Sequence, residues 1–335
     1  MRSLQINDDR ARNYRILFLL AALYNLGFGL WAGLLPHSFF FLFLMDPPRY
    51  PAIWQCLGMV IGLYGLAYGY AALRLDRACP FIAIGLIGKI LGPIGWVIAV
   101  GNGEWPIRTF TLICFNDLLW WLPFSLFLLE GSSLGDRIRA CAPYACALLN
   151  AIAAGAMLLI LRPGTEAVAD LVERAGYIAQ NPVLWRGGWA LWIAAALSLL
   201  AFYAWWGSHL SSPGPASAAF LIAVAGIACD CLAESLYIGW LPEHMDVAAP
   251  LGTLLTGAAA NGLYTLAGIV LTLATRSLKG ALLVWTWILW ICGLSLTVST
   301  LCGNVTAMVV STAILMTLFS PWVVVLGRTL KRSDP

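Results

Sequence analysis

The sequence has very little charge. Of its 335 residues only 10% are Asp, Glu, Lys or Arg, whereas a soluble globular domain carries roughly 25%. Histidine is also scarce, with 3 residues, so we expect no haem or metal centre and no resident cofactor. The 9 cysteines include no CxxC pair. These shortages exclude soluble enzymes, nucleic-acid-binding proteins and secreted disulfide scaffolds.

Long apolar stretches make up most of the chain. Hydrophobic residues account for 61% of it, and the mean hydropathy is +0.84. A helix that crosses a bilayer needs about 20 apolar residues. The sequence therefore predicts an all-α, polytopic integral membrane helix bundle with about ten transmembrane helices. The predicted helices are residues 14–35, 52–73, 80–101, 107–129, 140–161, 188–206, 216–241, 251–275, 281–303 and 305–326.

Ten crossings place both termini on the same side of the membrane. When the N-terminus is assigned to the cytoplasm, most Lys and Arg residues lie inside, and a minority, Arg49, Arg108, Arg162, Arg174 and Arg186, lie outside. This distribution follows the positive-inside rule. We therefore expect an N-in, C-in protein of a bacterial-type inner membrane, with the lipid bilayer as its main partner.

Two apolar segments are too short or too polar to cross. Residues 38–45 are rich in Phe and should lie in the interface or re-enter partway. Residues 163–187 form an outer loop with apolar side chains at helical spacing, which predicts an amphipathic surface helix. Thr165 is its expected N-cap, and Asn181 with Pro182 should end it.

The outer loop divides the chain into two groups of five crossings, residues 1–162 and 188–335. Halves with five crossings each have opposite orientations, as in transporters built from inverted repeats. A division into four and six helices at residues 131–139 fits equally well. Glycines interrupt both the third and the eighth helix. They indicate either a central binding site or close helix packing.

Tryptophans fall into two groups. Those that fit an interfacial aromatic belt are Trp105, Trp185, Trp189, Trp240 and Trp322. Those nearer the core, which are candidates to line a pocket, are Trp120, Trp121, Trp285, Trp287 and Trp290.

One pair of intramembrane charges comes from the third and fourth helices. Lys89 and Asp117 each lie nine or ten residues into a span, so both reach about mid-membrane. A charge inside the bilayer costs several kcal/mol and needs a partner. With Asn116 beside them, the two residues are either a gate that opens for a proton or substrate, or a structural ion pair.

A second pair lies in the seventh helix. Asp230 and Glu234 are four residues apart on one face of a helix that has no Lys or Arg. Two such carboxylates cannot both stay ionised in an apolar medium without a cation, so the pair should accept a proton or a monovalent cation. The eighth helix offers Asn261, Tyr264 and Thr265 as further ion or substrate ligands. Two more hydroxyls, Thr253 and Thr256, lie earlier in the same helix.

Three functions fit these residues. The first is a proton- or cation-coupled secondary transporter of a small solute that uses the carboxylate pair. The second is a membrane-embedded enzyme acting on a lipid, isoprenoid or quinone, with Asp230 or Glu234 as its general acid. The third is a non-catalytic subunit or assembly factor with a membrane protein partner or a second copy of itself. A pocket open sideways to lipid would favour the enzyme, and carboxylates without a cavity would favour the subunit.

Overall fold

The computed structural model describes residue 6, residues 8–241 and residues 243–333. These residues form helices and connecting loops, and no β-strand occurs among them. Ten of their helical segments are long and apolar enough to cross a membrane, so the chain is a multi-pass membrane protein. The ten segments are Arg10–Leu34, Pro51–Leu73, Cys79–Gly101, Ile107–Leu128, Ala142–Gly164, Pro182–Gly207, Pro213–Gly239, Met245–Ala274, Gly280–Leu301 and Val305–Lys331.

The chain divides into two compact units, residues 1–136 and residues 137–335. Unit 1 contains the first four long segments and unit 2 the other six. The boundary falls within residues 131–139, where the sequence permits a division into four and six helices. The five-plus-five arrangement of inverted halves stays a prediction.

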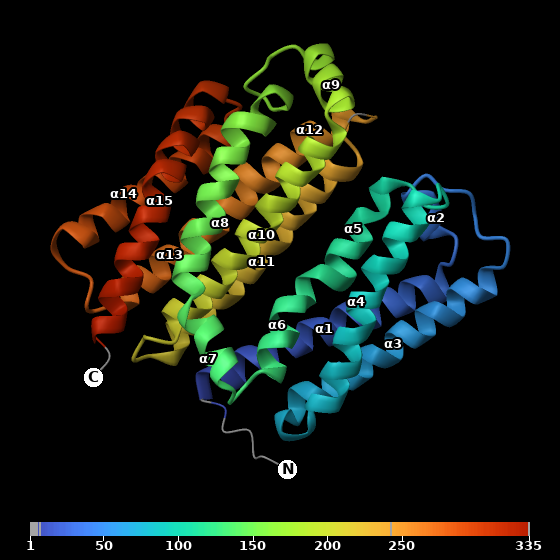
Figure 1. The fold of residues 1–335 in the computed structure, drawn as a ribbon, viewed down its shortest axis with the longest axis horizontal. Coiled ribbons are helices and arrows are strands. Elements are labelled where there is room, and N and C mark those ends of the chain that lie inside the picture. Colours follow the sequence, from blue (N-terminus) through green and yellow to red (C-terminus); the bar gives the residue numbers. More distant parts are fainter. Residues whose placement is uncertain (1–5, 7, 242, 334–335) are drawn as a thin grey trace. The chain divides into compact units, whose positions relative to one another are not determined.

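Unit 1 is built on a close crossing of its first two long helices. Its helices are α1 (Asp8–Leu34), α2 (Ser38–Leu42), α3 (Pro51–Leu73), α4 (Cys79–Gly101), α5 (Phe110–Ile113) and α6 (Leu119–Leu128). Helices α1 and α3 pack together along their length (Figure 1). A Cβ atom on Gly29 would lie 2.7 Å from the carbonyl oxygen of Gly58, so only glycine permits this approach.

Unit 2 buries a core of large aromatic and aliphatic side chains. Its helices are α8 (Ala142–Ala156), α9 (Leu171–Gln180), α10 (Pro182–Gly207), α11 (Pro213–Gly239), α12 (Met245–Thr253), α13 (Asn261–Ala274), α14 (Gly280–Leu301) and α15 (Val305–Ser333), and α7 (Ser133–Ala140) contains the boundary between the units. Trp206, Trp290 and Trp322 meet in this core, with the ring of Trp322 5.4 Å from that of Trp290. Trp322 is therefore a core residue, and its prediction as an interfacial side chain is wrong.

Several helices begin earlier than the apolar pattern predicts, because a proline starts them. Helix α10 begins at Pro182, six residues before the predicted start at residue 188, and α11 begins at Pro213. Proline is favoured in the first turn of a helix, where its missing N–H costs no hydrogen bond. In α10 the residues Arg186, Gly187 and Gly188 interrupt the apolar pattern after the first turn, and in α11 the first turn is Pro-Gly-Pro-Ala, so neither start stood out in hydropathy.

The surface helix in residues 163–187 is shorter than expected. Helix α9 starts at Leu171, and its N-cap is Asp170, whose carboxylate accepts a hydrogen bond from the backbone N–H of Val172 at 2.8 Å. The prediction of Thr165 as the N-cap is therefore wrong. The Thr165 hydroxyl instead donates to the carbonyl oxygen of Arg162 and holds the turn after α8. The predicted end at Asn181 is confirmed.

Three spans contain a π-helical turn. These turns are Cys114–Leu118 between α5 and α6 (η3), Met157–Leu161 after α8 (η4), and Leu254–Ala260 between α12 and α13 (η6). A π-helical turn holds an extra residue and rotates all later side chains of the helix, and such turns are frequent at functional sites. Two of the three lie in spans with candidate polar residues.

Candidate functional site

Unit 2 encloses a cavity of about 910 Å³. All six long segments of the unit contribute to its wall, which is mostly apolar and aromatic. The charged side chains in the wall are Arg162, Glu166 and Asp230. The cavity extends to the end of unit 2 that carries α9, here called the α9 end, because residues 165–167 also line it. A volume of this size accommodates a drug-sized molecule.

Asp230 supplies the carboxyl group deep in the wall. It lies nine residues before the end of α11, which corresponds to about 14 Å along the helix axis. One carboxylate oxygen accepts a hydrogen bond from the Thr256 hydroxyl at 2.5 Å, and the other accepts from the Tyr264 hydroxyl at 3.2 Å. Among the described residues, these two hydroxyls are its side-chain partners, and neither carries a compensating positive charge.

The π-helical turn η6 explains why Thr256 and Tyr264 reach the same carboxyl. Residues eight apart in a regular α-helix point about 80° away from each other, because each residue turns the helix by about 100°. One extra residue in a π-helical turn reduces the effective separation to seven, which leaves the two side chains about 20° apart. The local helix geometry therefore creates the two-hydroxyl site around Asp230.

The other predicted ligands have different surroundings. Glu234 is fully buried at 0% exposure and does not belong to the cavity wall. The Asn261 amide, which does line the cavity, donates to the carbonyl oxygen of Gly293 at 2.7 Å and to the Thr297 hydroxyl at 2.9 Å, and so joins α13 to α14. Thr265 is buried against Gly293 in the same interface. The structure thus brings Asp230 and Tyr264 together, while ion or substrate binding by all five residues stays a prediction.

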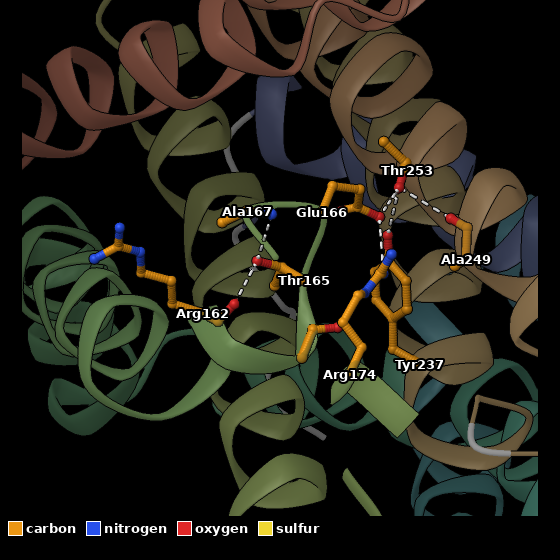
Figure 2. Close-up of polar contacts among 9 residues, drawn as sticks. Arg162, Thr165, Glu166, Ala167, Arg174, Tyr237, Ala249 and Thr253 are labelled. Atoms are coloured by element: carbon orange, nitrogen blue, oxygen red, sulfur yellow. Dashed lines mark hydrogen bonds and ion pairs between the residues drawn. The ribbon is translucent and has the colours of Figure 1, made fainter. Parts of the chain in front are cut away.

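A polar network lies at the α9 end of the cavity, and Glu166, Tyr237 and Thr253 of this network line the cavity (Figure 2). The Glu166 carboxylate accepts a hydrogen bond from Thr253 and lies 3.5 Å from the Arg174 guanidinium. The Tyr237 and Thr253 hydroxyls are 3.3 Å apart. Because Thr253 has one proton to donate, which Glu166 and the Ala249 carbonyl share, Tyr237 is the donor to Thr253. The network therefore links α9, α11, α12 and the loop segment that carries Glu166.

This network predicts that Glu166 holds the loop over the cavity. Replacing Glu166 with Gln removes the negative charge that faces Arg174, and hydrogen bonds to charged groups contribute about 1.5–3 kcal/mol. We expect amide hydrogen exchange in residues 165–180 to become at least about tenfold faster, since a factor of ten corresponds to ~1.4 kcal/mol. The exposed Glu173 of α9 is the matched control, and Glu173→Gln should leave exchange unchanged. Equal effects of the two substitutions would contradict a closing role for Glu166.

Unit 1 contains the predicted pair of Lys89 and Asp117, which is buried away from water. Lys89 is 4% and Asp117 is 3% exposed. The Lys89 ammonium donates to the backbone carbonyl of Asn116 and lies 5.9 Å from the ring centroids of both Tyr68 and Trp120. The Asn116 amide in turn donates to the Asp117 carboxylate at 3.0 Å.

Asn116 therefore bridges the two charges of unit 1. Within the part of the chain that the structure describes, Lys89 and Asp117 form no ion pair within 4.0 Å of each other. Their predicted role as a gate stays a prediction.

The sequence missed most of the aromatic wall. Tyr237 and Trp192 line the cavity, as does Trp189, which the sequence placed in the interfacial belt. One signal was present: Tyr237 follows Asp230 by seven residues, which is two helical turns on the same face. The predicted pocket residue Trp290 does line the cavity.

Comparisons with protein-family models, with curated proteins and with solved structures found no match. Fold and site define a multi-pass membrane protein with an intramembrane cavity. The function is therefore inferred from the chemistry of that cavity.

Proposed function

We propose that this protein is a secondary transporter that couples the movement of a small solute to a proton or monovalent cation at Asp230. The observation that carries the proposal is the Asp230 carboxyl in the wall of a 910 Å³ cavity within the membrane-spanning region. A carboxyl in hydrocarbon is stable when it is protonated or when it binds a cation, so its occupancy can alternate between the two. The hydroxyls of Thr256 and Tyr264 donate to the ionised form and keep it in place.

The surroundings of Asp230 fit a coupling site better than a packing contact. A carboxyl that serves packing alone would be enclosed by neighbouring helices, as Glu234 is. Asp230 instead has access to a cavity that extends to the α9 end of the unit, where Glu166 and Thr253 line it. This path provides entry for a solute and release for a proton.

Proton movement in proteoliposomes tests the proposal. Full-length protein is reconstituted with a pH-sensitive dye inside, and a panel of cationic, anionic and neutral amphipathic solutes is added outside. We expect at least one class of solute to drive proton movement, and Asp230→Asn to reduce its rate more than about tenfold. No response to any class, or full activity of Asp230→Asn, would contradict the proposal. Glu234→Gln, assayed in parallel, reports whether the second carboxyl of the predicted pair takes part.

Exposed apolar residues in the cavity wall favour a second candidate, an enzyme that acts on a lipid-like substrate. Leu158 of η4 and Val309 of α15 line the cavity, yet they are 67% and 47% exposed. Apolar side chains exposed on membrane-spanning helices face lipid. The cavity is thus reachable from the bilayer, and Asp230 would protonate a substrate that enters there. Incubating the protein with membrane lipid extract and searching for a changed lipid by mass spectrometry tests this candidate, and an unchanged extract would exclude it.

A further inference from the structure

The cavity wall near Asp230 is built from aromatic rings in contact with one another. The rings of Trp189 and Tyr237 lie 4.2 Å apart, and Trp192 lies 6.4 Å from Trp189. All three line the cavity. Because Tyr237 is seven residues after Asp230 in α11, this wall begins about 10 Å along the helix from the carboxyl. A ligand that touches Asp230 therefore extends along aromatic faces.

The charges around the cavity leave Asp230 as the carboxyl available to a ligand. Glu166, the other carboxylate in the wall, faces Arg174 at 3.5 Å. Arg162 also lines the cavity, and in Figure 2 its side chain points away from the Glu166 network. Near Asp230 the wall thus combines one carboxyl with hydroxyls and rings.

The elements that pack against α11 place no cation beside Asp230. These elements are α10, α12, η6 and α13, and among them Arg186 of α10 is the positively charged residue. Its neighbour Trp185 donates to the carbonyl oxygen of Tyr237, which puts Arg186 two turns away from Asp230. The nearby ionisable groups on α11 and α13 are Cys229, Cys231, Glu234, Tyr237 and Tyr264. None of these groups is positively charged.

We propose that the cavity binds an amphipathic organic cation, whose positive charge lies at Asp230 and whose apolar body lies against Trp189, Trp192 and Tyr237. This inference rests on the proposed transport function and specifies its substrate class. A carboxylate in a medium of low dielectric strongly favours a cation, and the aromatic faces add apolar contact with the body of the ligand. An anion would be repelled by the same carboxylate.

Binding of such a cation displaces the proton from Asp230. One positive charge enters the site as the O–H bond of the carboxyl breaks and the proton leaves through the cavity to water. The charge of the occupied site is the same before and after, so no charge is left unbalanced in hydrocarbon. Exchange of one cation for one proton follows, and cation affinity falls as the pH falls.

Two ions of nearly equal shape and opposite charge test this inference. Full-length protein in phosphatidylcholine nanodiscs is equilibrated with radiolabelled tetraphenylphosphonium or with tetraphenylborate. We expect saturable tetraphenylphosphonium binding that weakens at lower pH and weakens at least about tenfold in Asp230→Asn. Trp192→Leu should weaken it about three- to tenfold, because the apolar body loses its aromatic contact. The exposed Asp246 of α12 is the matched control, and Asp246→Asn should bind like the wild type.

The outcomes separate this inference from the function it rests on. Saturable binding of tetraphenylborate alone, or tetraphenylphosphonium binding that is unchanged in a correctly folded Asp230→Asn variant, overturns the cation as substrate class. Size-exclusion profiles and melting temperatures establish that the variant is folded. If an anionic or neutral solute still drives proton movement that depends on Asp230, the transporter proposal stands while the cation inference fails. If tetraphenylphosphonium binds as expected and no solute moves protons, the site assignment is supported and transport is refuted.

Discussion

Replacing Lys89 with Met should lower the free energy of unfolding by about 3 kcal/mol, and replacing Asp117 with Asn in the same chain should restore most of the loss. Removing one member of a buried charge pair leaves the other charge uncompensated in low dielectric, which typically costs 3–5 kcal/mol. Both side chains are almost fully buried, and Asn116 bridges them. The single variant also loses the contacts of the ammonium with two aromatic rings.

Thermal unfolding of the wild type, the two single variants and the double variant in one detergent measures this coupling. The exposed Lys279 provides a matched control, because Lys279→Met removes the same charge outside the spans and should change stability by less than about 0.5 kcal/mol. If the double variant is as unstable as the sum of the single variants, the two charges are independent. The pair would then not hold the helices of unit 1 together.

Replacing Gly268 with Ala should destabilise unit 2 by about 3 kcal/mol although it adds a single methyl group. A Cβ atom at this position would lie 2.3 Å from the Trp290 ring. That ring is held in place by its N–H, which donates to Thr272 at 2.9 Å, and by its edge contact with Trp322, and both contacts must change when the ring moves. Overpacking a well-filled core costs typically 1–3 kcal/mol.

The same substitution at Gly262 is the control for Gly268. Both glycines lie in α13, but a Cβ atom on Gly262 would be 3.4 Å from Thr297, which is close to ordinary van der Waals contact. Gly262→Ala should therefore be neutral or slightly stabilising, since alanine is the better helix former by about 1 kcal/mol. Equal melting temperatures for the two variants would show that the Gly268 interface is loosely packed. The close approach of the Trp290 ring to Gly268 supports helix packing as the reason for the glycine at position 268.

The sequence predicted the number of spans and their approximate positions. Apolar length alone decides whether a segment can cross a bilayer, so ten stretches of about 20 residues became ten long helices. The position of the ionisable residues along the helices was predictable too: Lys89, Asp117 and Asp230 all lie well inside their long apolar segments. Boundaries were less accurate where a proline begins a helix and a charged residue and glycines follow the first turn, as after Pro182.

The tertiary structure decided which polar groups meet. Asp230 and Glu234 look equivalent in the sequence, yet one lines the cavity and the other is fully buried. Side chains four residues apart on a helix point in directions about 40° apart. The packing of the neighbouring helices therefore buries one of them and leaves the other facing the cavity. Thr256 and Tyr264 both donate to Asp230 because η6 adds a residue to one helical turn and so rotates the side chains that follow. A hydropathy pattern contains no information about such a rotation.

The sequence by itself therefore determined that this is a ten-span membrane protein with carboxyls inside the membrane. Transfer into lipid depends on each segment's own composition, so it can be read segment by segment. Only the tertiary structure decided that Asp230 and Glu166 line the same aromatic cavity. That depends on how helices rotate and pack against one another, and lipid-facing and helix-facing apolar surfaces have the same composition.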